Sequence, residues 1–230
     1  MAVVHPGAPL ADTRTLDGAI LRVTEIFHSL QGETSRVGLP TVFVRLTGCP
    51  LRCGYCDTAY AFHGGASLTL EHILHEVAGY DTRYVTVTGG EPLAQKACLL
   101  LLTVLADRGY SVSLETSGAL DVSNVDARVS RIVDIKTPGS GEVEKNRWEN
   151  LLHLNARDEI KFVICDEPDY GWARDILAER KLDRVCAVLF SPSYGQLSAS
   201  ALAEWVLRDR LPVRLQVQLH KVLWGEEPGR

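Results

Sequence analysis

Gly48-Cys49-Pro50-Leu51-Arg52-Cys53-Gly54-Tyr55-Cys56-Asp57 places three thiols within eight residues at the spacing CxxxCxxC. Cysteine thiolates bind soft metals, and iron–sulfur clusters are usually held by four of them. No fourth cysteine lies nearby, because the remaining ones are Cys98, Cys165 and Cys186. A cluster held at three corners keeps one iron open to a small molecule, so this stretch predicts a reaction centre.

Two other metal sites remain possible for the three cysteines. Structural zinc normally takes four ligands, often from two CxxC pairs, and this chain has a single CxxC preceded by a wider gap. His28 or His63 would complete a Cys₃His zinc site. An electron-transfer cluster would need a fourth ligand from elsewhere. The spacing favours the open-iron cluster, with Tyr55 as an aromatic wall beside it.

Length and composition indicate one globular domain. The chain has 230 residues, 46% hydrophobic residues and a net charge of −5, which argues against nucleic acid as a partner. We expect a flexible extension over residues 1–18, which lack the apolar region of a secretory signal, and one domain over 19–230. No apolar run approaches the roughly 18 residues needed to span a bilayer. Unpaired cysteines in buried-looking segments favour the reducing cytoplasm.

Apolar runs alternate with helical patterns along the chain. Continuous Val/Ile/Leu runs are typical of parallel strands buried on both faces, and alternation with helices predicts right-handed crossovers. The strands are predicted at 21–27, 42–46, 84–88, 111–115, 132–135, 160–164, 185–190 and 213–217. The helices are predicted at 69–78, 94–108, 147–155, 170–180 and 199–210. A complete eight-fold α/β barrel needs about 250 residues, so we expect a partial, open barrel of about six parallel strands.

A second motif, Thr88-Gly89-Gly90-Glu91-Pro92, directly follows a predicted strand. Paired glycines let a backbone approach a ligand closely, because no Cβ intervenes. Like the cysteines after 42–46, this motif lies at the carboxyl end of its strand, where parallel α/β folds build their sites. Taken alone, a Gly-Gly pair is as consistent with an ordinary turn.

Together these motifs resemble the radical S-adenosylmethionine (SAM) enzymes. The resemblance implies that Cys49, Cys53 and Cys56 hold a [4Fe–4S] cluster whose open iron chelates SAM. It also implies that SAM is cleaved to methionine and a 5′-deoxyadenosyl radical, which abstracts a substrate hydrogen. Gly89-Gly90 would lie at the SAM methionyl group.

Further segments are similar to the 7-carboxy-7-deazaguanine synthase family, from about Leu21 to Trp224. They are Leu30-Gln31-Gly32-Glu33, Cys56-Asp57-Thr58, Glu115-Thr116-Ser117-Gly118 and Gln216-Val217-Gln218-Leu219-His220-Lys221. The resemblance implies a lyase of queuosine and 7-deazapurine biosynthesis. Its reaction converts 6-carboxy-5,6,7,8-tetrahydropterin to 7-carboxy-7-deazaguanine with loss of ammonia, regenerating SAM. Magnesium would support the step, with Thr58 as its protein ligand, and a homodimer is implied.

The resemblance also assigns substrate contacts. They are Leu30, Gln31, Gly32, Glu33, Arg45, Thr88, Glu115 and His220. An arginine suits the substrate carboxylate, and glutamates suit the N–H groups of a pterin. Three of them have a structural alternative: an internal ion pair for Arg45, a capped strand end for Glu115, and a structural histidine at a strand end for His220.

For SAM the implied contacts include two places where this chain departs from the family. The contacts are Tyr55, Cys56, Asp57, Gly90, Asp134, Lys136 and Ser191. A family Ser-Pro-Lys is Asp134-Ile135-Lys136 here, so only Lys136 matches cleanly. A family Gln-Pro segment is replaced by Ser191-Pro192-Ser193. A solvated lysine is the structural alternative for Lys136.

Two other functions stay open. A radical SAM activase, which generates a glycyl radical on a partner enzyme, shares the short barrel and the cysteine spacing but would not need the Leu30–Gly32 or Glu115–Gly118 motifs. A zinc- or cluster-binding interaction module belongs to a different class. For the enzyme we expect a small-molecule substrate and a reductant such as flavodoxin or ferredoxin, with no nucleic acid and no membrane.

Overall fold

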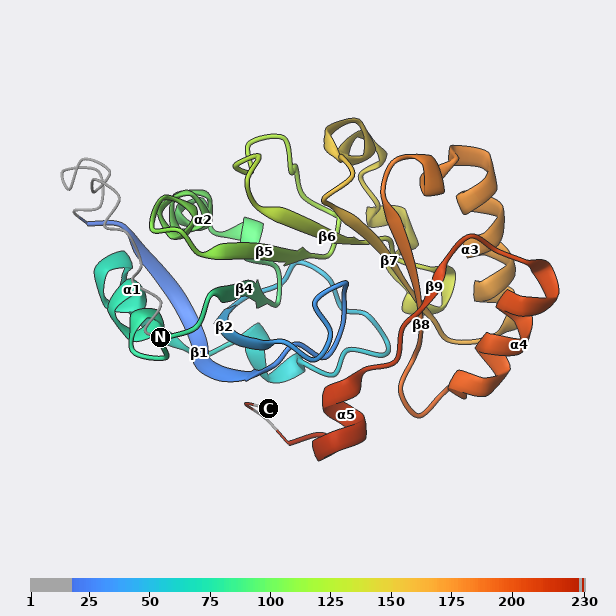
Figure 1. Ribbon diagram of the computed structural model, residues 1–230, viewed down its shortest axis with the longest axis horizontal. Helices are drawn as coiled ribbons and strands as arrows, with labels where there is room; N and C mark the ends of the chain where they lie inside the picture. Colours follow the sequence, from blue (N-terminus) through green and yellow to red (C-terminus); the bar gives the residue numbers. More distant parts are fainter. Residues whose placement is uncertain (1–17, 228, 230) are drawn as a thin grey trace, which may run out of the picture.

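The computed structural model describes residues 18–227 and 229. The predicted extension over residues 1–18 therefore lies almost wholly outside the described residues. Within them, strands and helices alternate around one continuous sheet, with the helices along its outer side (Figure 1). None of the helices in this part of the chain is long and apolar enough to cross a membrane.

The sheet has nine strands in the order β3-β1-β2-β4-β5-β6-β7-β8-β9. Their bounds are β1 Ile20–Leu30, β2 Pro40–Leu46, β3 Ala66–Thr69, β4 Tyr84–Gly89, β5 Ser111–Thr116, β6 Ser130–Asp134, β7 Glu159–Ile164, β8 Ala187–Pro192 and β9 Arg214–Leu215. Every neighbouring pair from β2 to β9 is parallel, whereas β1 is antiparallel to both β2 and β3. The result is an open, partial α/β barrel, as the sequence predicted.

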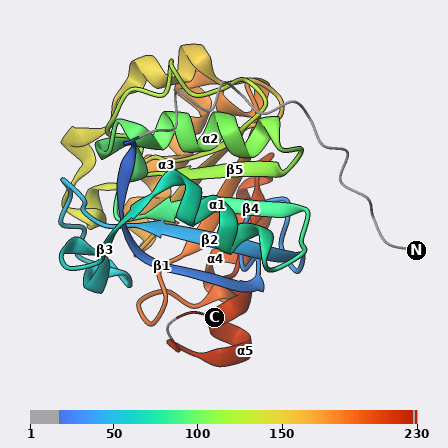
Figure 2. The same cartoon turned by 90° about the vertical axis from the view of Figure 1, so that its left-hand side faces the viewer.

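Four α-helices cover the outer face of the sheet in two groups. Their bounds are α1 Leu70–Ala78, α2 Ala97–Asp107, α3 Glu167–Arg180 and α4 Ala199–Asp209. Figure 2 shows α1 and α2 over the strands of the first half, where they pack in one apolar cluster with β1, β2, β4 and β5. The helices α3 and α4 pack in a second cluster with β7 and β8.

Side-chain alternation along the strands separates this core from the barrel interior. Successive residues of a strand point to opposite faces. In β2, Val42 and Val44 join the helix-facing core, while Phe43 and Arg45 line a cavity inside the barrel. In β7, Ile160 and Phe162 join the core, while Lys161 and Val163 line the cavity. The inner face of the sheet therefore carries the polar residues.

Several elements differ from the sequence prediction. The strand β3 was missed because its short, exposed sequence Ala-Ser-Leu-Thr carries little apolar signal. The segment predicted as a helix at 147–155 is a 3₁₀ helix, Trp148–His153, and the strand predicted at 213–217 shrinks to Arg214–Leu215. A short helix, α5 (Leu219–Trp224), follows it. His220 thus lies on a helix and not at a strand end, which corrects that expectation.

The connection between β1 and β2 also differs from the parallel arrangement that the sequence predicts. Only residues 31–39 join β1 to β2, which is too short for a crossover, so the two strands pair antiparallel. Further 3₁₀ turns lie in the loops, at Ala59–Phe62, Pro92–Ala94, Pro138–Ser140, Val143–Lys145 and Leu182–Arg184. Several of these loops stand at the carboxyl ends of strands, around the cavity.

Candidate active site

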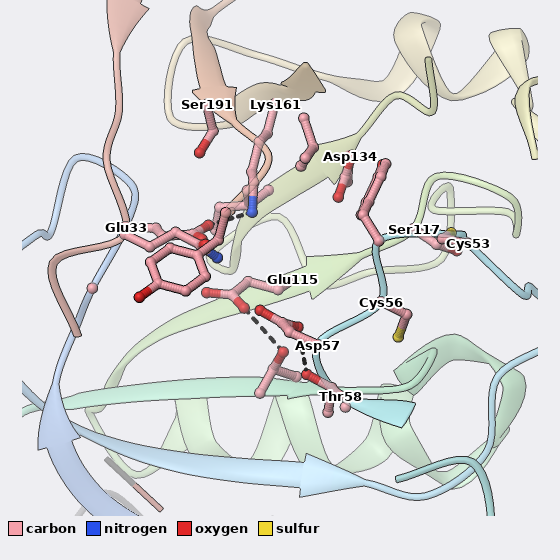
Figure 3. A pocket seen from close by; sticks show the side chains of 18 of the residues that line it. Glu33, Cys53, Cys56, Asp57, Thr58, Glu115, Ser117, Asp134, Lys161 and Ser191 are labelled. Carbon is pink, nitrogen blue, oxygen red and sulfur yellow. Dashed lines mark hydrogen bonds and ion pairs between the residues drawn. The ribbon is translucent and has the colours of Figure 1, made fainter. Parts of the chain in front are cut away.

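A cavity of about 360 Å³ opens at the carboxyl ends of the parallel strands (Figure 3). Each of the residues assigned from sequence to the cluster, SAM, magnesium or the substrate lines it. They are Leu30, Gln31, Gly32, Glu33, Arg45, Cys49, Cys53, Tyr55, Cys56, Asp57, Thr58, Thr88, Gly90, Glu115, Asp134, Lys136, Ser191 and His220. Residues from both ends of the chain and every central strand therefore meet in one place.

Backbone hydrogen bonds hold the loop that carries the cysteines. The Gly48 N–H donates to the Ala61 carbonyl at 2.8 Å, and the Gly54 N–H to the Ser140 carbonyl at 3.0 Å. Within the loop, the Leu51 N–H donates to Cys49 Sγ at 3.4 Å. The loop is thus fixed on two sides before any metal binds, and one of its sulfurs already accepts a hydrogen bond.

The three thiols are half-buried on this cavity. Burial raises the pKa of Cys49 and raises that of Cys53 to about 11, so metal binding must displace their protons. Thiols that line a cavity suit a cubane, which offers each of them a separate iron. The donor set therefore fits a three-cysteine [4Fe–4S] cluster.

The zinc alternative lacks its fourth ligand. His28 and His63 are exposed, and neither is among the described residues that line the cavity. Within residues 18–227 and 229, no three His, Cys, Asp or Glu side chains gather around a point where one metal ion would sit. The Cys₃His site considered from the sequence is not assembled.

Gly90 brings the second motif against the cysteine loop. A Cβ at Gly90 would lie 2.4 Å from the Gly48 carbonyl oxygen and 2.8 Å from Cys49 Cβ. The next residue, Glu91, donates its backbone N–H to the same Gly48 oxygen at 2.8 Å. The close backbone approach that the glycines allow is thus to the cysteine loop, and it places the motif beside the thiols.

Glu91 itself is wholly buried and does not line the cavity. Its carboxylate accepts hydrogen bonds from the Thr116 hydroxyl at 2.9 Å and from the Ser117 N–H at 2.7 Å. It also accepts one from the Ser117 hydroxyl. These bonds tie the loop after β4 to the end of β5, so Glu91 fixes the cavity wall from behind.

Glu33 and Lys161 form a buried ion pair at the centre of the cavity (Figure 3). Burial alone would raise the pKa of Glu33, but the charge and hydrogen bond of Lys161 lower it below its usual value. Gln218 adds a hydrogen bond to Glu33 Oε1 at 2.8 Å. Glu33 is therefore ionised and held on two sides.

Glu115, which is half-buried, is the second glutamate of the cavity. It accepts from the Thr88 hydroxyl at 2.9 Å and from Gln31 Nε2 at 3.2 Å. Burial and the neighbouring charge of Glu33 raise its pKa. The two glutamates thus differ in electrostatic environment, since Glu33 has a cation and Glu115 has neutral partners.

Arg45 forms an internal ion pair, as the structural alternative for this residue predicts. Its Nε donates to Glu25 Oε1 at 2.7 Å, across the antiparallel strands on which the two residues are register partners. Its guanidinium also lies over the rings of Phe27 and Tyr60, at 5.6 and 5.8 Å from their centroids. Arg45 still lines the cavity, so the pair does not remove it from the site.

Asp57 links the cysteine loop to α5. Its Oδ2 pairs with Lys221 Nζ at 2.8 Å, and its Oδ1 accepts from the Thr58 hydroxyl at 2.9 Å. Burial would raise the pKa of Asp57, but the hydrogen bond and charge of Lys221 lower it to about 2. Because the Thr58 hydroxyl gives its proton to Asp57, its oxygen lone pairs are left for another partner.

Beside Tyr55 of the cysteine loop, Lys136 is buried, so the solvated-lysine alternative is wrong. Its Nζ pairs with Asp134 Oδ2 at 2.9 Å and lies 5.8 Å from the Tyr55 ring centroid. Asp134 Oδ1 and the Tyr55 hydroxyl are buried without a hydrogen-bond partner among the described residues. Such orphaned groups fit a site that a polar ligand completes.

Sequence reasoning missed Lys161, Lys221 and Gln218, which bind the predicted residues Glu33 and Asp57. A usable signal existed for Lys161, because it is the one charged residue within the apolar run 160–164 and therefore points to the opposite face from its neighbours. Lys221 lies in a segment that resembles the family, but its partner depends on how α5 folds back.

Comparisons with known proteins agree with the fold and with the resemblance found in the sequence. Residues 43–136 match the radical SAM superfamily. The 7-carboxy-7-deazaguanine synthase of Chlorobaculum tepidum is 49% identical over 212 residues, which cover 91% of this chain and 96% of the relative. The synthase of Koribacter versatilis is 44% identical over 222 residues, covering 90% and 98%.

Among solved structures, QueE from Escherichia coli superposes with a TM-score of 0.74 at 24% identity, covering 91% of this chain and 99% of that one. This likeness supports the partial barrel. The sequence relatives carry the assignment further, because they are similar over nearly the whole of both chains. This chain belongs to the 7-carboxy-7-deazaguanine synthase family of radical SAM enzymes.

Proposed function

We propose that this chain is a lyase that converts 6-carboxy-5,6,7,8-tetrahydropterin to 7-carboxy-7-deazaguanine with loss of ammonia. The observation that carries the proposal is the shared cavity, on which three cysteines lie together with two glutamates and an arginine. Its relatives named as 7-carboxy-7-deazaguanine synthases support this reaction over the activase alternative.

Cys49, Cys53 and Cys56 would hold the [4Fe–4S] cluster, which with bound SAM supplies a 5′-deoxyadenosyl radical. The chain's own task is to orient SAM. The residues that would do so all line the cavity, with Lys136 beside the Tyr55 ring: Tyr55, Cys56, Asp57, Gly90, Asp134, Lys136 and Ser191. The unpartnered Asp134 Oδ1 and Tyr55 hydroxyl support a polar ligand there.

The substrate would lie between the two glutamates and Arg45. Glu33 and Glu115 offer acceptors for N–H groups of the pterin, and Arg45 offers a planar donor pair for its carboxylate. Leu30, Gln31, Gly32, Thr88 and His220 complete this wall of the cavity. Arg45 can keep Glu25 while using its other guanidinium nitrogens, since the ion pair uses Nε.

Thr58 is proposed to ligate Mg²⁺. Its hydroxyl proton is engaged by Asp57, so the oxygen can accept a cation. Magnesium prefers oxygen ligands and combines one or two protein groups with waters and substrate oxygens. The role of Thr58 would be to fix the cation, and through it the substrate carboxylate, against the wall that carries Asp57.

Partners and compartment follow as proposals from the same function. A low-potential reductant such as flavodoxin or ferredoxin would deliver the electron, and neither nucleic acid nor a membrane is needed. The open sheet ends in the two-residue strand β9, and this edge is compatible with a homodimer. We propose that the protein is located in the cytoplasm.

One anaerobic assay tests the function. The reconstituted protein is given reductant, SAM and 6-carboxy-5,6,7,8-tetrahydropterin, with and without Mg²⁺. We expect a deazapurine chromophore, released ammonia and little net SAM loss, whereas an activase would consume SAM stoichiometrically with its protein partner. Absence of the deazaguanine product, with uncoupled SAM cleavage intact, would contradict the substrate assignment alone.

A further inference from the structure

Lys161 is the cavity cation whose only partner among the described residues is itself a proposed substrate ligand. It extends from β7 into the barrel interior and pairs with Glu33 (Figure 3). The other lining cations are engaged elsewhere: Arg45 with Glu25, Lys136 with Asp134, and Lys221 with Asp57. Lys161 therefore stands apart by its position next to the substrate wall.

The ammonium group of Lys161 has hydrogen-bonding capacity to spare. It carries three N–H donors and no acceptor. One donor goes to Glu33 Oε2, and no other described residue accepts a hydrogen bond from it. The carboxylates of Glu33 and Asp134 raise the pKa of Lys161 despite its burial, so the group stays charged. At least one donor is free for a ligand.

Glu33 and Lys161 together present an acceptor beside a donor. The pyrimidinone ring of a pterin presents the reverse along one edge, where a ring N–H adjoins a carbonyl oxygen. Resting on the proposed function, we propose that Lys161 binds the ring carbonyl oxygen of the substrate while Glu33 accepts from the adjacent ring N–H and amino group. Lys161 is thereby a specificity-determining residue for 4-oxo over 4-amino pteridines.

The chemistry of a 4-amino pteridine explains the selectivity. Its ring nitrogen has lost the hydrogen and would turn a lone pair toward Glu33, while its amino group would turn N–H bonds toward the Lys161 ammonium. Both contacts become repulsive in a buried site. A site built to hydrogen-bond a substrate group rejects analogues that leave its polar groups unpaired.

Two stable pteridines test the proposal without turnover. We would titrate 6-carboxypterin and 2,4-diaminopteridine-6-carboxylic acid, by their fluorescence, into the reconstituted enzyme with SAM under anaerobic conditions. Wild type should bind the 4-oxo compound at least about 100-fold more tightly. In Lys161→Met this preference should fall at least about fivefold, because the donor to the carbonyl oxygen is gone while Glu33 still discriminates. SAM affinity and cluster absorbance report whether the variant is assembled.

Two further variants keep the test decisive if Lys161→Met does not fold. Lys161→Arg retains charge and donors and should retain the 4-oxo preference. Lys161→Gln can donate or accept through its amide and should lower the preference by a similar factor, because only Glu33 then discriminates. Unchanged preference in Lys161→Gln or Lys161→Met would overturn the role of Lys161 while leaving the lyase intact. Failure of wild type to bind 6-carboxypterin would overturn the proposed substrate together with this inference.

Discussion

At the scale of single residues, the Glu33–Lys161 pair shows how burial and charge compete. Both side chains are largely shielded from solvent, so each charge depends on the other. Breaking a buried pair by removing one partner is strongly destabilising, because the remaining charge is left unpaired. Removing either residue should therefore destabilise the fold in addition to affecting substrate binding.

Lys161→Met should lower the free energy of unfolding by about 3 kcal/mol near neutral pH. In wild type the pKa of Glu33 is lower in the folded state than its ordinary value of 4.5, which stabilises the fold at pH values above 4.5. This stabilisation is lost as the pH falls through the pKa that Glu33 has in the folded state. In the variant, unopposed burial raises that pKa, so stability is lost as pH rises through it.

The difference between the two proteins should therefore be largest at pH 7–8 and shrink toward pH 5. Anaerobic urea unfolding across this range measures it, with Lys145→Met as the control at an exposed lysine. A difference that stays constant with pH would contradict the assigned cause.

Gly90→Ala should impair cluster binding. The added Cβ would meet the Gly48 carbonyl oxygen at 2.4 Å, and backbone cannot move aside as a flexible side chain can. We expect iron content and cluster absorbance after anaerobic reconstitution to fall several-fold. Gly171→Ala is the matched control, because a Cβ there meets nothing within 4 Å. Equal iron in both variants would show that the cysteine loop tolerates displacement.

At the scale of elements, α5 connects three parts of the site. The Leu219 N–H donates to the Gly32 carbonyl at 2.9 Å, Gln218 binds Glu33, and Lys221 binds Asp57. His220 packs so closely on Gly32 that a Cβ there would lie 2.0 Å from its Nδ1. A helix of six residues has little stability of its own, so these contacts hold it in place.

Lys221→Met should loosen α5 and the residues around Asp57 together. Amide hydrogen exchange should become faster in residues 219–224 and 49–58, because the ion pair that joins them is lost. Exchange in β4 and β5 should not change. Faster exchange confined to 219–224 would mean that Asp57 is held without Lys221, and Lys145→Met again serves as the exposed control.

The elements that the sequence predicted well are those whose burial is visible as a run of apolar residues. Strands such as β4 and β7 are continuous apolar runs, and their predicted bounds lie within one residue of those observed. The strand β3 and the helix α5 are short and partly exposed, so tertiary contacts and not local pattern determine them. The Arg45–Glu25 pair depends on the antiparallel register of β1, which apolar content alone does not encode.

The candidate site was predictable for a different reason. Its residues lie at the carboxyl ends of strands. Once the strands are predicted correctly, these residues are therefore expected at the same edge of the sheet. The partners of these residues were harder to predict. The contacts of Lys161, Gln218 and Lys221 depend on packing between segments that are distant in sequence. The roles assigned to each residue stay predictions that the experiments above address.

At the scale of the whole molecule, the core is divided where β5 meets β6. One apolar cluster lies beneath α1 and α2, and the other beneath α3 and α4. No helix of the described chain connects β5 to β6. Asn150 organises this connection instead, with its amide bound to the Gly118 and Leu120 carbonyls and its Oδ1 accepting from the Val122 N–H.

Asn150→Ala should lower the free energy of unfolding by roughly 3 kcal/mol, because it leaves several buried backbone groups unpaired. Thermal or urea unfolding measures the loss, and Asn124→Ala at an exposed position of the same connection is the control. Similar stability of the two variants would show that water replaces the missing amide.

The return of α5 to the segment after β1 has a consequence for biosynthesis. Gln218 and Lys221 close the cavity against Glu33 and Asp57, which are synthesised 185 and 164 residues earlier, respectively. Most of the barrel can form during translation, since domains fold as the chain emerges. The pocket itself is finished only after residues 218–221 have been made, so a nascent chain that ends before them exposes its thiols in an unclosed cavity.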